Sequence, residues 1–262
     1  RELHNHDVEF PIFIKPRYGN KTSSSKDCYK IKNKQELVPH LHKSEMMWSE
    51  FVNAREGMTD LVVVNGHIVY QLTYQYSEKQ NGFADDWKFI SPENQPPPEI
   101  IQWIEKHMHG YTGPLNMQYR DNKIIEVSLR FARGGAYIES TGNHALVDNI
   151  NNMWKHKTWD HRNEDKLYFE PYYSFKCWSP IPVLYLLPHP IIHTYLNNNG
   201  VMPLHEYYFE PTGTHSLIFY QFLHHDFDKG MKIKKHLEKL FLTMNILIWI
   251  LFLIGIVCLF IN

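Results

Sequence analysis

Short apolar runs separated by turn-forming residues fill the first third of the chain, and this pattern is typical of β-strands. Asn65-Gly66 lies between two runs rich in β-branched residues and predicts a tight hairpin turn, because both residues readily adopt positive φ angles. Residues 34–43 predict a short helix. The predicted strands cover 11–16, 29–31, 46–52 and the two arms of a hairpin over 61–74.

The middle of the chain mixes strands with helices. Residues 78–98 are polar and rich in proline, which predicts a loop. In 99–110 the isoleucines recur at helical spacing before Gly110, so we expect an amphipathic helix there. This mixture favours an α+β or α/β fold over a β-sandwich. The remaining predicted elements are strands over 114–120 and 123–131, joined at Asp121-Asn122, and a helix over 144–154.

Residues 156–228 differ in composition from the segment before them. Aromatic residues and prolines crowd together there, with five prolines between Pro171 and Pro190. Prolines at this density interrupt helices and interior strands, so we expect edge strands and ordered loops. The segment is either an extension of the preceding domain or the end of that domain.

The C-terminal end of the chain is apolar on every side. Residues 240–261 carry no charge, and Thr243 and Asn245 are their only clearly polar side chains. At ~1.5 Å per residue a helix of this length reaches about 33 Å, enough for a hydrocarbon core of roughly 30 Å. A buried core helix is the alternative, but such helices are usually amphipathic. We therefore predict a single transmembrane helix.

Five lysines crowd residues 229–239, directly before the predicted span. Positive charge favours the cytoplasmic side of a membrane, so this basic juxtamembrane segment predicts a tail anchor with the folded part in the cytoplasm. The lysines either contact anionic headgroups or form a solvated helix start. The internal membrane of a large virus particle is one setting for such a protein.

Composition narrows the partners further. The chain has 27 Lys and Arg residues and 28 Asp and Glu residues, so it has no net positive charge that would attract nucleic acid. We therefore expect no nucleic-acid partner. Three widely spaced cysteines form no disulfide framework and suit a reducing compartment.

Two neighbouring features near the N-terminus suit phosphate binding. Lys15 ends an apolar strand directly before a proline, which places a cation at a strand terminus facing a loop. The following loop, 19–26, is small and polar, and its backbone N–H groups and hydroxyls are donors for phosphate oxygens. A surface serine-rich turn is the alternative. The loop residues that would contact phosphate are Gly19, Ser23, Ser24 and Ser25.

Three segments in this order, 13–31, 46–69 and 113–135, resemble the ATP-grasp fold, in particular its carbamoyl-phosphate-synthetase-like branch. The resemblance covers roughly residues 9–154 and lacks the usual N-terminal lobe. It implies two α+β lobes that hold ATP and magnesium between them, with the loop after Lys15 covering the triphosphate. The chain then divides into an ATP-grasp-like domain over 1–155, the segment 156–228, the basic segment 229–239 and the transmembrane helix 240–261.

The resemblance also implies roles for acidic residues after the third strand. Glu50 and Phe51 resemble the interdomain hinge whose backbone pairs with adenine, and Glu56 resembles the acid that binds the ribose. Taken singly, each acid is better explained as a solvated loop residue, and only their order together favours the functional interpretation equally.

Triphosphate chemistry needs magnesium held by oxygen ligands on neighbouring strands. Gln118 and Glu126 are polar residues among apolar neighbours on two such strands. The family pattern Glu-x-Asn-x-Arg is matched by Glu126, Ser128 and Arg130, with serine in place of asparagine. The shorter serine side chain puts two-metal catalysis in doubt. The resemblance implies that Arg130 neutralises charge on the transferring phosphoryl group.

Two functions from different classes follow. In the first, the protein is a membrane-anchored ATP-dependent ligase: a substrate carboxylate attacks the γ-phosphate, and an amine or thiol then displaces the acyl phosphate. In the second, a degenerate ATP-grasp fold serves as a scaffold on a membrane, and residues 156–228 form the surface that docks protein partners.

Overall fold

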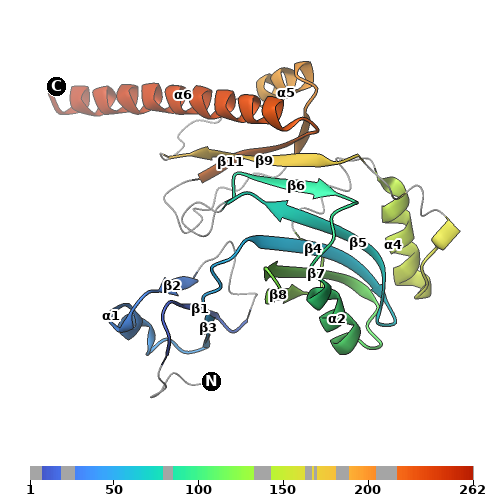
Figure 1. The fold of residues 1–262 in the computed structure, drawn as a ribbon. Helices are drawn as coiled ribbons and strands as arrows, with labels where there is room; N and C mark the ends of the chain where they lie inside the picture. The colour runs from blue at the N-terminus through green and yellow to red at the C-terminus, as the bar shows by residue number, and fades with distance from the viewer. Residues whose placement is uncertain are drawn as a thin grey trace.

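The structure is a computed structural model with two sheets and a long C-terminal helix (Figure 1). It describes residues 8–18, 27–78, 85–132, 143–162, 167, 170–180, 189–204 and 217–261. A three-stranded sheet forms a small lobe, and an eight-stranded antiparallel sheet forms a large lobe. The expectation of two α+β lobes is therefore confirmed.

The small lobe is built from the N-terminal strands. Its sheet has the order β2-β1-β3, with β1 at the centre. The apolar side chains of Ile12, Ile14, Ile31 and Leu37 form its core. Its elements are β1 (Ile12–Pro16), β2 (Tyr29–Ile31), α1 (Lys34–Leu37), the 3-10 turn η2 (Val38–His40) and β3 (Met46–Glu50).

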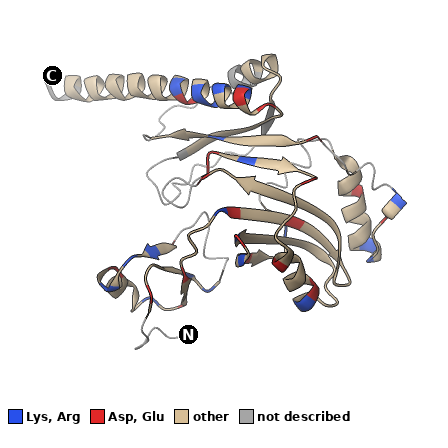
Figure 2. Cartoon of the chain, in the orientation of Figure 1, with Lys and Arg blue, Asp and Glu red and all other residues tan. Residues whose placement is uncertain are grey.

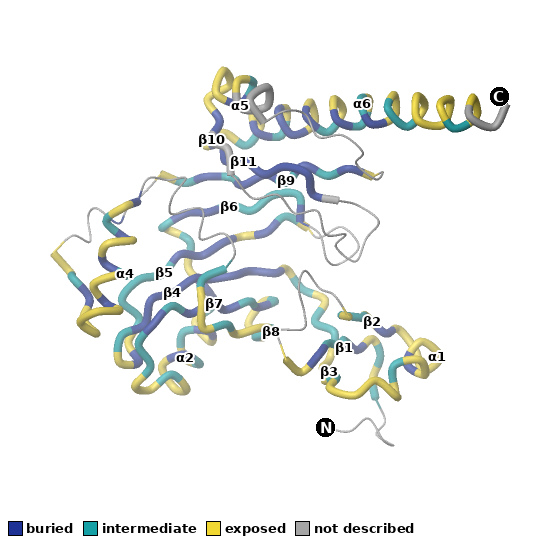
Figure 3. Tube along the Cα trace, turned by 180° about the vertical axis from the view of Figure 1, so that it is seen from behind, coloured by how far each residue is buried: buried dark blue, intermediate teal, exposed yellow. Residues whose placement is uncertain are grey.

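The large sheet has the order β10-β11-β9-β6-β5-β4-β7-β8, and all its pairings are antiparallel. Asn65 (φ 49°) and Gly66 (φ 84°) form the predicted hairpin turn between β4 and β5. Figure 3 shows that β4 is buried along most of its length. The strands are β4 (Glu56–Val64), β5 (His67–Tyr76), β6 (Trp87–Ser91), β7 (Gly113–Arg120), β8 (Lys123–Ser128), β9 (Tyr172–Ser179), β10 (Met202–Leu204) and β11 (Leu217–His224).

Two helices cover opposite faces of the sheet near β4. Helix α2 (Pro98–His107) packs through Ile100 and Ile104 on the face that holds Leu61. Helix α4 (His144–His156) packs on the other face, which holds Val62. Neighbouring strand residues point to opposite faces, so β4 needs apolar residues at consecutive positions. A further helix, α5 (His189–Asn198), follows β9 in the chain.

One expectation about strands was wrong and another held in part. The segment 78–98 contains β6, which pairs with β5 on one side and β9 on the other, so it is not all loop. In 156–228, β10 with Pro203 is an edge strand as expected, whereas β9 lies inside the sheet. The residues of β9 contain no proline, because Pro171 and Pro180 flank the strand without interrupting it. The sheet therefore continues through residues 156–228.

Helix α6 (Phe227–Ile261) runs unbroken from the last strand to the end of the chain. Its first half packs on the sheet through buried residues at a spacing of four: Ile233, Leu237, Phe241 and Asn245. Lys234 is also buried and forms ion pairs with Asp86 at 3.3 Å and with Glu238. The segment 229–239 is therefore part of the core, although Lys229, Lys232, Lys235 and Lys239 are exposed.

The second half of α6 carries no charge and is largely exposed from Ile246 to Cys258 (Figure 2). Within the described ranges, α6 is the one helix whose length and composition suit a membrane span. Unlike the expected division at residue 239, one continuous helix joins the folded domain to the apolar end.

Two glycines of α6 test its packing. A Cβ on Gly230 would overlap the ring of Phe175, which is fully buried and has no room to move, whereas a Cβ on Gly255 meets nothing within 4 Å. We expect Gly230→Ala to lower the free energy of unfolding by about 1–3 kcal/mol through overpacking. Gly255→Ala should stay within about 1 kcal/mol of the wild type. Denaturation of the detergent-solubilised protein measures both, and equal effects would contradict the packing of α6 on β9.

Candidate functional site

Among the described residues, Lys15, Glu50 and Glu126 lie along the seam where the small lobe meets strand β8. Two contacts join the small lobe to β8, and a third joins β7 to the segment between β3 and β4. Lys15 Nζ donates to the Ile125 carbonyl at 2.7 Å, and Lys123 Nζ lies 2.6 Å from Glu50 Oε1. Arg120 donates to the Val52 carbonyl at 2.9 Å. The small lobe is thus held against the edge of the large sheet.

A β-bulge explains the position of the Lys15 contact. Gln118 pairs with Glu126 and Tyr119 pairs with Ile124, so Ile125 is left without a partner in the β7–β8 ladder. A bulged residue disrupts the local ladder, and the Ile125 carbonyl accepts the lysine of the other lobe. This contact places the Lys15 ammonium beside the residue that precedes Glu126.

The three predicted metal ligands lie on neighbouring positions of one sheet face. Gln118 is directly opposite Glu126, and Ser128, two residues further along β8, is opposite Asn116. Because alternate residues of a strand share a face, the three oxygen-bearing side chains point the same way. Glu126 is exposed, and Gln118 and Ser128 are partly buried.

This donor set fits one magnesium ion. Magnesium in nucleotide sites is commonly held by one or two carboxylates together with phosphate oxygens. Glu126 offers the carboxylate, and the amide of Gln118 and hydroxyl of Ser128 offer neutral oxygens. Among the described residues no group of three or more His, Cys, Asp or Glu side chains is arranged for a metal.

Cys28 lies in the same seam, a position that sequence reasoning did not predict. Burial raises the pKa of its thiol, the nearby Lys15 ammonium lowers it, and the charges of Glu126 and Asp27 raise it. The electrostatic influence of both Lys15 and Glu126 on one thiol indicates that charges from the two lobes converge here.

The hinge residues have partners of their own. The Phe51 N–H donates to the Pro11 carbonyl at 3.2 Å, and its ring lies 3.8 Å below Lys30 Nζ. Glu50 is exposed and pairs with Lys123. The hinge is thus tied to the small lobe through backbone and ring contacts.

Glu56 is buried and forms an ion pair with Arg120. The closest approach is 3.1 Å, and the arginine Nε also donates to Glu56 Oε2 at 3.2 Å. The two residues face each other across the β4–β7 ladder. Sequence reasoning missed Arg120; its position at the last residue before the Asp121-Asn122 turn was the available signal.

Asp60 is a buried carboxylate on β4 that links three parts of the large lobe by hydrogen bonds. Its carboxylate accepts hydrogen bonds from Tyr74 Oη at 2.8 Å, Asn116 Nδ2 at 2.8 Å and the Ala132 N–H at 2.9 Å. Burial raises the pKa of Asp60, and these three donors oppose the rise. The bond to Ala132 holds the chain just after Arg130, whose exposed guanidinium donates to the Phe131 carbonyl.

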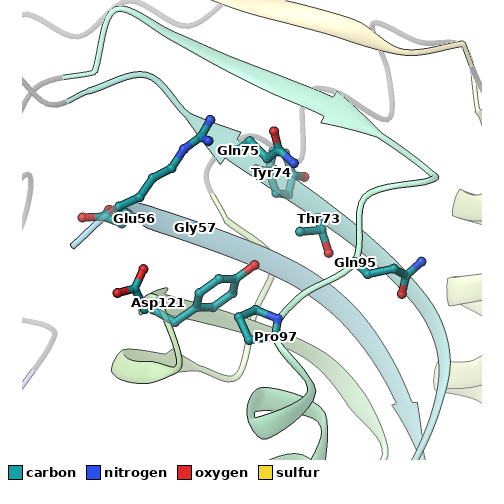
Figure 4. Close-up of a pocket in the computed structure, with 10 residues that line it drawn as sticks. Glu56, Gly57, Thr73, Tyr74, Gln75, Gln95, Pro97 and Asp121 are labelled. Atoms are coloured by element: carbon teal, nitrogen blue, oxygen red, sulfur yellow. The ribbon is translucent and has the colours of Figure 1, made fainter.

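The predicted phosphate-binding residues of the loop after Lys15, Gly19, Ser23, Ser24 and Ser25, lie outside the described residues. A pocket of about 190 Å³ opens on the other face of the sheet (Figure 4). Its lining includes Glu56, the predicted ribose contact, together with four residues on the opposite face of the sheet from Gln118. These four residues are Gly57, Thr73, Gln75 and Tyr119.

The fold resembles solved structures of ATP-grasp enzymes. An L-amino acid ligase from Bacillus licheniformis matches with a TM-score of 0.59 and 14% identity, over 90% of this chain and 63% of that one. Carboxyaminoimidazole ribonucleotide synthase from Aspergillus clavatus, complexed with ATP, matches with a TM-score of 0.59 and 8% identity, over 86% and 60%. The corresponding synthetase from Thermus thermophilus matches with a TM-score of 0.55 and 10% identity, over 88% and 62%.

This chain therefore has an ATP-grasp fold and spans less than two thirds of the length of these enzymes. No family model and no curated protein matches its sequence.

The two ion pairs near the hinge predict different costs of mutation. The side chains of Arg120 and Glu56 are 15% and 6% exposed, whereas those of Lys123 and Glu50 are 52% and 65% exposed. Arg120→Leu removes the cation that faces the buried Glu56 carboxylate and should lower the free energy of unfolding by about 3 kcal/mol. Lys123→Ala should cost at most about 1 kcal/mol. Chemical denaturation measures both losses. A loss for Arg120→Leu no larger than that for Lys123→Ala would argue against the buried pair.

Proposed function

We propose that the protein binds ATP and magnesium in the seam between the small lobe and β8, and that it is an ATP-dependent ligase. The observation that carries this proposal is the bond of Lys15 to the carbonyl of Ile125, the residue before Glu126, at the junction of two lobes with an ATP-grasp fold. Membership of the carbamoyl-phosphate-synthetase-like branch is part of the same proposal.

In this proposal each predicted site residue contacts a different part of the nucleotide. Lys15 exchanges its bond to the Ile125 carbonyl for a phosphate oxygen, which is a stronger, charge-assisted acceptor. Gly19, Ser23, Ser24 and Ser25 add donors to the triphosphate. The hinge at Glu50 and Phe51 contacts adenine through its backbone. Glu56 binds the ribose with the carboxylate oxygen that Arg120 orients.

Glu126, Gln118 and Ser128 would hold one magnesium ion, which neutralises phosphate charge when it is bound. A carboxylate oxygen of the substrate then attacks the γ-phosphorus, the bond to ADP breaks, and an acyl phosphate forms. An amine or thiol attacks the acyl carbon, and inorganic phosphate leaves. Arg130 stabilises the negative charge on the transferring phosphoryl group.

We also propose that α6 anchors this enzyme in a membrane. The exposed apolar half of the helix supports insertion, and the exposed lysines before it support a cytoplasmic position for the domain. An internal membrane of a virus particle would satisfy the same topology.

A scaffold function is the second candidate. Two observations favour it: Glu56 is already engaged by Arg120, and Ser128 stands where the family pattern has asparagine. In this case residues 156–228 bind protein partners, and the seam binds no nucleotide.

Nucleotide binding by seam variants tests the two candidates. A charge-assisted contact contributes about 1.5–3 kcal/mol, so Lys15→Met and Glu126→Gln should each weaken ATP-Mg binding tenfold or more. Glu126→Gln should act chiefly in the presence of magnesium. Lys32→Ala, an exposed lysine on the same lobe, is the matched control and should bind like the wild type.

Calorimetric titration of the full-length protein in detergent measures these affinities. Equal affinity in the wild type and both seam variants would remove the seam as the site. No binding in the wild type would contradict the ligase proposal and favour the scaffold.

A further inference from the structure

The apolar half of α6 and the small lobe extend from the same end of the large sheet. Figure 1 shows the C-terminus and α1 beyond one end of strands β9, β6 and β5, and Figure 3 shows the same arrangement from behind. Helix α4 lies at the opposite end of the sheet. A bilayer that receives the free half of α6 therefore faces the small lobe and not α4.

The helix has no linker that would separate the domain from a membrane. It is packed on the domain as far as Asn245, which is fully buried, and it continues unbroken to Ile261. Because no loop separates the packed part of the helix from its exposed part, a bilayer that receives the exposed part lies close to the domain.

The tip of the small lobe has the side chains that such a surface requires. Val38 and Leu41 in and after η2 are 56% and 41% exposed, although both are apolar. Lys34 and Lys43 flank them, and both are exposed. Apolar side chains that insert shallowly, together with lysines that meet anionic headgroups, are typical of membrane-surface segments.

Nearby acidic groups are largely satisfied within the tip. Glu36 accepts the Lys32 N–H at 2.8 Å and an amide hydrogen from Asn33. Glu36 thus stabilises the start of α1 and keeps its negative charge, so residues 34–43 carry two lysines against one acidic side chain.

We propose that the α1–η2 tip, residues 34–43, binds the headgroup region of the same anionic bilayer that receives α6. This inference rests on the proposed membrane anchor. With both lobes in contact with the membrane, the bilayer would set the angle at which the small lobe meets β8, and so the geometry of the seam.

The experiment places an environment-sensitive fluorophore at three positions of the full-length protein. Val38→Cys reports the tip, Leu251→Cys reports the free half of α6, and Val147→Cys on α4 is the matched control. Cys28→Ser and Cys258→Ser remove the two accessible native thiols, and Cys177 is fully buried. The protein is reconstituted into vesicles of phosphatidylcholine and phosphatidylserine that carry a nitroxide quencher at the headgroup.

We expect quenching of the Val38 label to exceed that of the Val147 label by threefold or more, together with a blue-shifted emission. The Leu251 label should also be blue-shifted by insertion. Replacing phosphatidylserine with phosphatidylcholine should reduce the quenching at Val38 but leave the emission at Leu251 unchanged.

Three results would overturn the proposal, and each has a different meaning. An inserted Leu251 label with Val38 quenched no more than Val147 leaves the anchor intact and removes the tip contact. A Leu251 label that remains in water removes both. A blue shift at Val38 that depends on protein concentration in lipid-free detergent identifies a second copy of the chain as the occupant.

Discussion

Strand β4 positions both sides of the site because it is buried along nearly its whole length and pairs on both edges. Its first residue, Glu56, fixes Arg120 near the hinge, and Asp60 fixes Asn116 and the chain after Arg130. Both carboxylates are buried, and removing their partners would leave charge in a medium of low dielectric. The register of β4 with β7, and through it of β7 with β8, therefore determines where Gln118 and Glu126 lie.

Local patterns predicted much of the fold. Asn65-Gly66 turns the hairpin as expected, and the helical spacing in 99–110 identified α2, because both signals depend only on near neighbours in the chain. Strand β6 escaped prediction because its five residues lie within a polar segment and gain their order by pairing with β5 and β9. Likewise, the lysines before the apolar end looked solvated, and only the packing of α6 on β9 buries Lys234.

The alternation of polar and apolar residues predicted Gln118 and Glu126 as isolated polar residues on two neighbouring strands, and they are paired in the structure. The bulge at Ile125 and the Glu56–Arg120 pair depend on the register between strands distant in sequence, which no local pattern contains. The remaining site assignments stay predictions. In the proposed site Glu126 is the one carboxylate among the three predicted magnesium ligands, and an unbroken α6 would hold this site at a fixed distance from a membrane.

Hydrogen exchange of the full-length protein with and without ATP-Mg tests the central claim most directly. If the seam holds the nucleotide, the amides of 46–56 and 123–128 should exchange more slowly in its presence, because these segments form the hinge and the edge strand of the site. Amides on α4, at the other end of the sheet, should be unchanged. Protection confined to the pocket around Thr73 and Gln95, or no protection at all, would contradict the account.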